Sequence, residues 1–66
     1  MNVILYTVEC PKCKVLTMKL DKKGINYTKV EDVDTMLAKG IKTAPYLEVD
    51  NELMDFTQAI AWVNAQ

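Results

Sequence analysis

Residues 3–13 decide the fold, and they read VILYTVECPKC. The run Val3–Thr7 is apolar and rich in β-branched and aromatic residues, which predicts a strand buried on both faces and central in its sheet. Pro11 suits the first turn of a helix, where its missing N–H group costs nothing. We expect this helix to reach about Lys23 and to end at Gly24, a residue that readily forms a left-handed cap.

Short alternating or β-branched runs predict three further strands, at Ile25–Val30, Tyr46–Val49 and Glu52–Met54. The pair Asp50-Asn51 lies between the last two strands and is typical of a tight hairpin turn. These two strands are therefore expected to run antiparallel.

Capping residues predict two more helices. Asp32 precedes a short helix that should end at Gly40, and Asp55 with Gln58 resembles a capping box before the last helix. Helical spacing then predicts the side chains that face inward. They are Cys13, Leu16 and Leu20 in the first helix, Val33, Met36 and Leu37 in the second, and Phe56, Ala59, Ile60 and Val63 in the third.

The predicted order βαβαββα combines one parallel crossover, expected to be right-handed, with a terminal hairpin. It corresponds to an α/β fold in which helices flank a mixed four-stranded sheet. The 66 residues are 50% hydrophobic and 26% charged, which is an ordinary globular composition. We expect residues 1–66 to form one small domain with a thin stability margin.

Composition excludes several classes of function. The chain has no histidine, which removes every Ser-His, Cys-His and His-metal arrangement. Eight lysines against nine acids give a net charge of -1, which argues against a nucleic-acid-binding module. No apolar run approaches the ~20 residues of a membrane span. We expect a cytoplasmic protein, in which cysteines stay reduced unless they are catalytic or bind metal.

The motif Cys10-Pro11-Lys12-Cys13 carries the chemistry. At a helix start, unpaired N–H groups and the helix dipole stabilise a thiolate and lower the pKa of a thiol such as Cys10. Lys12 adds positive charge nearby, whereas Glu9 opposes it, and the sequence leaves that balance open. Cys13 lies one turn deeper and should be less exposed. We therefore expect Cys10 to attack and Cys13 to resolve.

Two other interpretations of the cysteines remain. Zinc usually takes four ligands and the motif supplies two, so a zinc or iron–sulfur site would need two chains or carboxylate donors. A purely structural disulfide would close too short a loop to constrain the unfolded chain strongly. A cysteine pair beside a βαβ pattern is instead typical of thioredoxin-like redox proteins.

The chain resembles a glutaredoxin, including the small glutaredoxin-like redoxins of the NrdH type, through Tyr6-Thr7, the CPKC motif and Thr43-Ala44-Pro45. The resemblance implies the thioredoxin fold, with sheet order 2-1-3-4 and a cis Ala44–Pro45 peptide beside the cysteines. It also implies that Thr43, Ala44 and Pro45 line a groove for glutathione or a protein disulfide.

The resemblance extends to other residues of the proposed site. Pro11 and Lys12 would contact substrate between the cysteines, where glutaredoxins often have an aromatic residue in place of Lys12. Asp55 would either hold the α-amino group of glutathione or only cap the last helix, and we favour the cap because the family's Gly-Gly turn is missing here. Tyr6 would form part of the site wall or belong to the core.

The resemblance thus predicts a monomeric dithiol–disulfide oxidoreductase that needs no bound metal or organic cofactor. Its electron donor would be glutathione or a flavoprotein thioredoxin reductase. Its substrates would be disulfide-containing proteins, with ribonucleotide reductase as a candidate at the level of the family. The alternative is a binding module in which two chains share zinc or an iron–sulfur cluster through their cysteine pairs.

Overall fold

The computed structural model describes residues 2–66 and contains four strands and three helices. In chain order they are β1 (Val3–Tyr6), α1 (Pro11–Lys22), β2 (Thr28–Val30), α2 (Val33–Ala38), β3 (Tyr46–Val49), β4 (Glu52–Met54) and α3 (Phe56–Asn64). The strands form one mixed sheet in the order β2-β1-β3-β4. The predicted α/β architecture, element order and strand order are confirmed.

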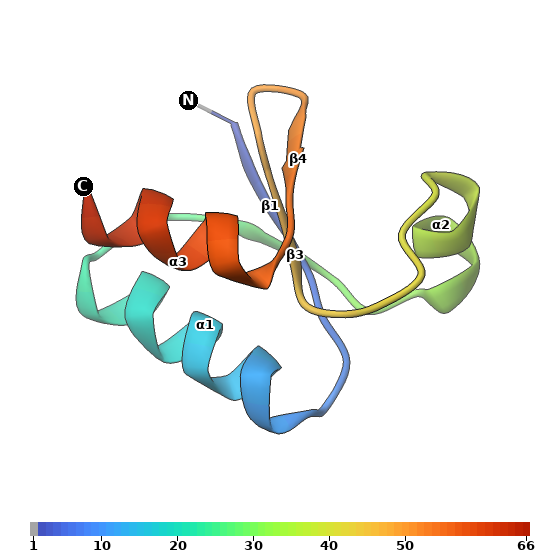
Figure 1. The fold of residues 1–66 in the computed structure, drawn as a ribbon, viewed down its shortest axis with the longest axis horizontal. Coiled ribbons are helices and arrows are strands. Elements are labelled where there is room, and N and C mark those ends of the chain that lie inside the picture. The colour runs from blue at the N-terminus through green and yellow to red at the C-terminus, as the bar shows by residue number, and fades with distance from the viewer. Residues whose placement is uncertain (1) are drawn as a thin grey trace.

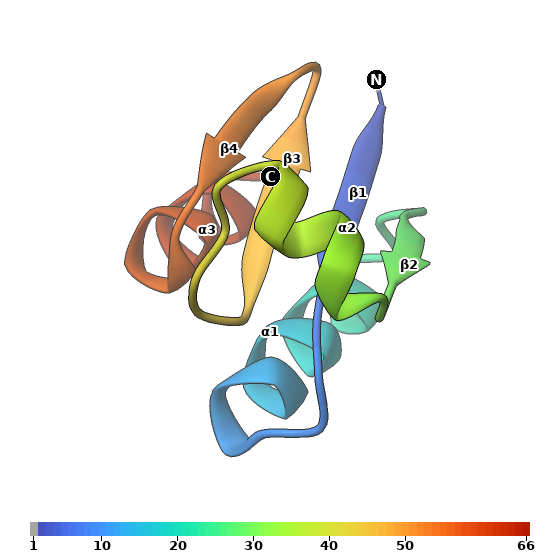
Figure 2. The ribbon, with the colours of Figure 1, turned by 90° about the vertical axis from the view of Figure 1, so that its right-hand side faces the viewer.

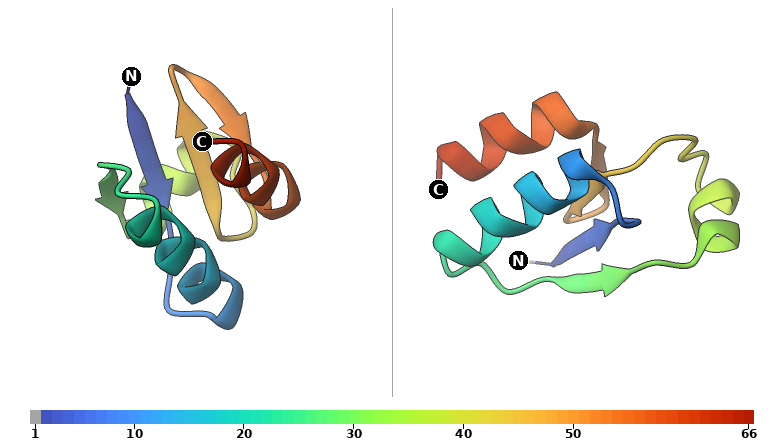
Figure 3. Two further views of the ribbon diagram at one scale, coloured as in Figure 1. Left: turned by 90° about the vertical axis from the view of Figure 1, so that its left-hand side faces the viewer. Right: turned by 90° about the horizontal axis from the view of Figure 1, so that it is seen from below.

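The helices cover the two faces of this sheet unequally (Figure 1). α2 lies in front of the strands in Figure 2, whereas α1 and α3 lie together on the opposite face. Figure 3 shows that α1 and α3 run side by side in the same direction, so their N-terminal ends lie at the same end of the molecule. β1 pairs in parallel with β2 and antiparallel with β3, which in turn pairs antiparallel with β4.

Side-chain alternation along β1 supplies both faces of the core, because successive residues of a strand point in opposite directions. Leu5 is fully buried in the cluster shared with α1 and α3, and Tyr6 is buried in the smaller cluster under α2. The larger cluster consists of Val3, Leu5, Leu16, Leu20, Leu47, Val49, Ala59 and Val63. The smaller one consists of Tyr6, Met36 and Ile41. The continuous apolar run thus marks a strand buried on both faces, as predicted.

Helix ends and turns follow local chemistry. α1 ends before Gly24, whose φ of 68° lies in the left-handed region that glycine adopts without penalty. The turn between β3 and β4 has positive φ at both Asp50 and Asn51, the residues predicted to form it. Asp50 also accepts a hydrogen bond from the backbone N–H of Asn2, at 2.8 Å, which ties the start of β1 to this turn.

The structure corrects three details. β2 is limited to Thr28–Val30, three residues shorter at its start than the predicted Ile25–Val30. Val33 and Leu37 do not face inward: they are 53% and 58% exposed, because α2 is short and only Met36 contacts the sheet core. Asp32 precedes α2 as predicted, but its carboxylate accepts from the Thr35 hydroxyl rather than capping the backbone.

Within residues 2–66, none of the helices combines the length and apolar character that crossing a bilayer requires.

The two faces of α1 should respond very differently to truncation. Leu20 is fully buried, so Leu20→Ala should lower the free energy of unfolding by about 2–5 kcal/mol. Met18 is 68% exposed on the same helix, and Met18→Ala should change it by less than about 0.5 kcal/mol. Urea titration followed by circular dichroism measures both values. Equal losses in the two variants would contradict the orientation of α1.

Candidate functional site

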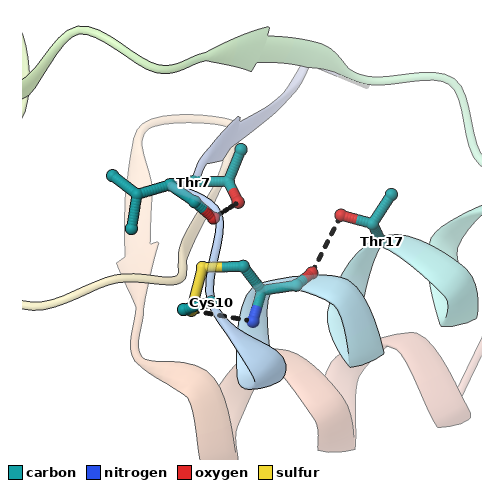
Figure 4. The surroundings of a disulfide bond; sticks show 5 residues. Thr7, Cys10 and Thr17 are labelled. Atoms are coloured by element: carbon teal, nitrogen blue, oxygen red, sulfur yellow. Dashed lines mark hydrogen bonds between the residues drawn. A yellow bond between two sulfur atoms is a disulfide. The ribbon is translucent and has the colours of Figure 1, made fainter.

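Cys10 and Cys13 form a disulfide at the first turn of α1 (Figure 4). Cys10 is the N-cap residue, with extended backbone angles (φ −140°, ψ 160°), and Pro11 occupies the first helical position. The Sγ atom of Cys10 accepts a hydrogen bond from the backbone N–H of Cys13, with N and S 3.1 Å apart. A sulfur atom therefore takes the place that an N-cap oxygen usually holds.

The two sulfurs differ in their surroundings. Cys10 is half-buried, whereas Cys13 is only 2% exposed and faces inward with Leu16 and Leu20. The carbonyl of Cys13 also accepts a hydrogen bond from the Thr17 hydroxyl at 2.9 Å, seen in Figure 4. A reagent from solution thus reaches Cys10 more readily than Cys13, as the sequence predicts.

The register of β1 and β3 determines what lies beside the cysteines. Tyr6 pairs with Tyr46 in an antiparallel ladder, so the chain that leaves β1 and the chain that enters β3 lie at the same end of the sheet. The first of these segments leads to Cys10, and the second is Thr43-Ala44-Pro45. The Ala44–Pro45 peptide is cis, as the family resemblance implies. Pro45 is buried and Thr43 is exposed.

The start of α3 lies against the start of α1. The Lys12 ammonium lies over the Phe56 ring, 5.5 Å from its centroid, which is within cation–π range. Sequence patterns alone did not predict this contact, because nothing in the spacing shows that α1 and α3 begin at the same end. Lys12 therefore lies at the junction of the two helices, next to the cysteine pair in the chain.

Asp55 acts as a helix cap. Its Oδ1 accepts from the backbone N–H of Gln58 at 2.8 Å, and the Gln58 side chain accepts from the Asp55 N–H at 3.0 Å. This reciprocal pair is the predicted capping box, and it uses one of the two carboxylate oxygens. Asp55 is exposed, so its other oxygen faces water near the start of α3.

Tyr6 does not line the cysteine site. Its side chain is 1% exposed and packs with Met36 and Ile41 on the α2 face of the sheet, whereas the disulfide belongs to α1 on the other face. The prediction that Tyr6 forms part of the site wall is wrong, because the alternation along β1 turns it away from α1. The core interpretation of this tyrosine is the one the structure supports.

A buried carboxylate, Glu48, was not predicted from the sequence. Its side chain is 7% exposed, and Oε1 accepts hydrogen bonds from the Lys39 ammonium and the Tyr6 hydroxyl, each at 3.0 Å. The hydrogen bond from Lys39 lowers the pKa of Glu48 below its ordinary value; the Tyr6 hydroxyl acts in the same direction and burial opposes them. A charge between Leu47 and Val49 in a predicted central strand was the available signal.

A cleft of about 420 Å³ lies beside residues 8–10, the loop that leads from β1 into α1 and that we call the cysteine loop. It separates the first turns of α1 from the end of β2. Its lining residues are Thr7, Val8, Glu9, Cys13, Lys14, Thr17, Met18, Lys29 and Glu31. Cys13 is the one member of the disulfide that borders it. None of Thr43, Ala44, Pro45 and Asp55 lines this cleft, so the cleft is separate from these predicted site residues.

The potential metal-ligating side chains, nine carboxylates and two cysteines, are dispersed in the structure. Within residues 2–66, no three His, Cys, Asp or Glu side chains come together in a way that would hold a metal ion.

A scan against models of known protein families finds no match. Searches of curated proteins and of solved structures likewise return no match.

Two substitutions separate the cap hydrogen bond of Asp55 from the effect of its charge. Asp55→Ala removes the cap and should cost about 1 kcal/mol of stability, whereas Asp55→Asn keeps a capping oxygen and should stay close to the wild type. Chemical denaturation measures both variants. Loss of stability in Asp55→Asn equal to that in Asp55→Ala would show that charge, rather than the cap hydrogen bond, stabilises the helix start.

The carboxyl of Glu48 should titrate below the ordinary range of a glutamate. Because its pKa is lower in the folded than in the unfolded chain, its contribution to stability is complete above the unfolded pKa and is lost as the pH falls through the folded pKa. A carbon-13 NMR titration should show this depressed midpoint, and Lys39→Met should raise it. Lys29→Met, which removes the partner of Glu31, is the matched control and should not move it.

Proposed function

We propose that this protein is a dithiol–disulfide oxidoreductase with a thioredoxin fold, related in kind to the glutaredoxins. One observation carries the proposal: a cysteine pair three residues apart closes a disulfide at a helix N-terminus, with Cys10 accessible and Cys13 buried. Two cysteines in a purely structural bridge would gain nothing from this difference in exposure.

The reduced protein would transfer two electrons to a substrate disulfide in two steps. The Cys10 thiolate attacks one substrate sulfur, which forms a mixed disulfide and releases the other substrate sulfur as a thiolate. Cys13 then loses its proton and attacks the Cys10 sulfur, so that the Cys10–Cys13 disulfide forms and the second substrate thiol leaves. The substrate gains two electrons from the protein. It takes up two protons, one from Cys13 and one from solvent, which replaces the proton that Cys10 lost when it became a thiolate.

The helix start supports the first step. In the reduced protein, the unpaired N–H groups of the first turn and the positive end of the α1 dipole would stabilise the Cys10 thiolate. The N–H of Cys13 already points at the Cys10 sulfur. In the disulfide form the two Cα atoms are 5.1 Å apart, within the range of ordinary disulfides.

The segment before β3 supports substrate binding. Within residues 2–66, the peptide groups of Thr43 and Ala44 take part in no backbone–backbone hydrogen bond. Unpaired peptide groups can accept hydrogen bonds from, and donate them to, the backbone of an extended chain, as in the binding of an added strand. We propose that Thr43, Ala44 and Pro45 bind the substrate backbone in this way, with Pro11 and Lys12 on the other side of the reacting sulfur.

The proposed substrates are disulfide-containing proteins, with ribonucleotide reductase as a candidate, and the proposed donor is glutathione or a flavoprotein thioredoxin reductase. Asp55 already serves as a cap, which favours the disulfide chemistry over specific glutathione binding. The protein would act as a cytoplasmic monomer without a bound cofactor.

Single cysteine variants test the proposal. Cys13→Ser keeps the attacking thiol but cannot resolve, so on reaction with oxidised glutathione or a protein disulfide it should accumulate a mixed disulfide at Cys10, visible by mass spectrometry. Cys10→Ser should form a mixed disulfide much more slowly, because its remaining thiol is buried. In the wild type, alkylation of Cys10 should already be fast at a pH below the ~8.5 of a free cysteine. Equal trapping by both variants, or alkylation like that of a free thiol, would refute the assignment.

The donor can be identified by reducing the oxidised protein with glutathione or with thioredoxin reductase and NADPH. Efficient turnover with the reductase alone would indicate a thioredoxin-like supply of electrons. Efficient turnover with glutathione would indicate a glutaredoxin-like one. Reduction by neither would contradict both proposed donors.

A further inference from the structure

Glu48, Lys39 and Tyr6 form a network at the α2 face of the sheet, and we call these three residues the Glu48 network. A carboxylate buried among hydrophobic strands is costly unless it is paired and hydrogen-bonded. Here one carboxylate oxygen accepts from two donors at 3.0 Å each. The Lys39 ammonium also lies 5.7 Å from the centroid of the Tyr6 ring. Each of the three side chains therefore contacts both of the others.

The network closes a loop of chain. Lys39 is the residue after α2 and Glu48 is in β3, so their ion pair joins the two ends of the connection that contains Thr43-Ala44-Pro45. The same connection is held at a second point, because Ile41 is 2% exposed in the core and its N–H donates to the Met36 carbonyl at 2.9 Å. The connection is thus anchored to the sheet by Lys39 and Ile41, while Thr43 is exposed to water.

We propose that the Glu48 network is a positioning device that holds Thr43-Ala44-Pro45 at the angle at which it pairs with the extended chain of a disulfide substrate. This inference rests on the proposed function and adds the residues that set substrate affinity. The three residues are positioning residues rather than catalytic ones. They lie on the face of the sheet opposite α1 and act on the substrate only through the segment they anchor.

A purely structural role predicts something different. If the network only stabilised the fold, its loss would lower the free energy of unfolding but leave substrate affinity unchanged in the molecules that remain folded. A positioning role predicts that KM rises for a substrate long enough to reach the segment, while kcat and reactions with very small disulfides keep their rates. The ratio between long and short substrates separates the two roles.

The test uses Lys39→Met, which keeps the aliphatic stem and removes the ammonium. Turnover of a neutral homodimeric peptide disulfide is measured with dithiothreitol as the reductant. The single-turnover rate of the pre-reduced protein is measured with dipyridyl disulfide. We expect KM for the peptide to rise about tenfold in Lys39→Met, while kcat and the dipyridyl disulfide rate change less than about twofold. Circular dichroism confirms that each variant is folded.

Three further variants complete the design. Lys39→Arg keeps a cation opposite Glu48 and should restore KM to near the wild-type value. Lys22→Met removes an exposed lysine from the far end of α1 and should leave every parameter unchanged. If Lys39→Met does not fold, Glu48→Gln takes its place, because the amide keeps an acceptor oxygen for Tyr6 while losing the charge that holds Lys39.

The outcomes are distinct. A folded variant with wild-type KM for the peptide would overturn the positioning role and leave the proposed function standing. Equal slowing with the peptide and with dipyridyl disulfide would also overturn it, since the effect would then act on the dithiol itself. A wild-type protein that reduces neither disulfide would refute the proposed function, and the positioning role with it.

Discussion

The antiparallel pairing of β1 with β3 is the constraint on which the rest of this small protein depends. Leu5 pairs with Leu47 at its centre, and both are fully buried in the core beneath α1 and α3. Because the two strands run in opposite directions, the last residue of β1 and the first residue of β3 lie at the same end of the sheet. This register brings the loop before Cys10 and the segment Thr43-Ala44-Pro45, more than thirty residues later in sequence, to the same end of the sheet.

Two helices also begin at this end of the molecule. α1 and α3 run in parallel, so the N-cap residues Cys10 and Asp55 lie at the same end of the molecule, and Lys12 bridges the helices by resting on Phe56. Two N-termini that point the same way concentrate unpaired N–H groups and positive dipole ends there. That environment favours negative charge, such as that of the Asp55 carboxylate and, in the proposed reaction, that of the Cys10 thiolate. The chain thereby reaches a chemically polarised site without a histidine or a dense cluster of charges.

Local patterns predicted the elements well because each depends on neighbours in sequence. The VILYT run, Pro11 at a helix start, the Asp50-Asn51 turn and the Asp55–Gln58 box all appear where expected. Apart from the start of β2 and the missing cap bond of Asp32, the errors concern which way a side chain points. Val33 and Leu37 were placed inward by spacing, but a six-residue helix touches the sheet mainly through Met36.

Long-range contacts of the candidate site were the part beyond sequence patterns. The cysteines and the segment before β3 are recognisable motifs. The two partners of Glu48, by contrast, come from β1 and from the residue after α2, and no periodicity connects Tyr6, Lys39 and Glu48. Tyr6 itself was misplaced because a central strand offers both faces, and only the register decides which face carries the helix with the cysteines.

The brevity of β2 and β4 has a consequence for how the protein behaves in crowded solution. They are the two outer strands of the sheet, and each is only three residues long. Outer strands expose unpaired peptide groups that can template the addition of a strand from another molecule. Because each outer strand has so few of these groups, the sheet is a poor template for edge-to-edge growth into fibrils. Thr43 and Ala44 precede the inner strand β3, so the strand-like binding proposed for their peptide groups does not depend on either outer strand.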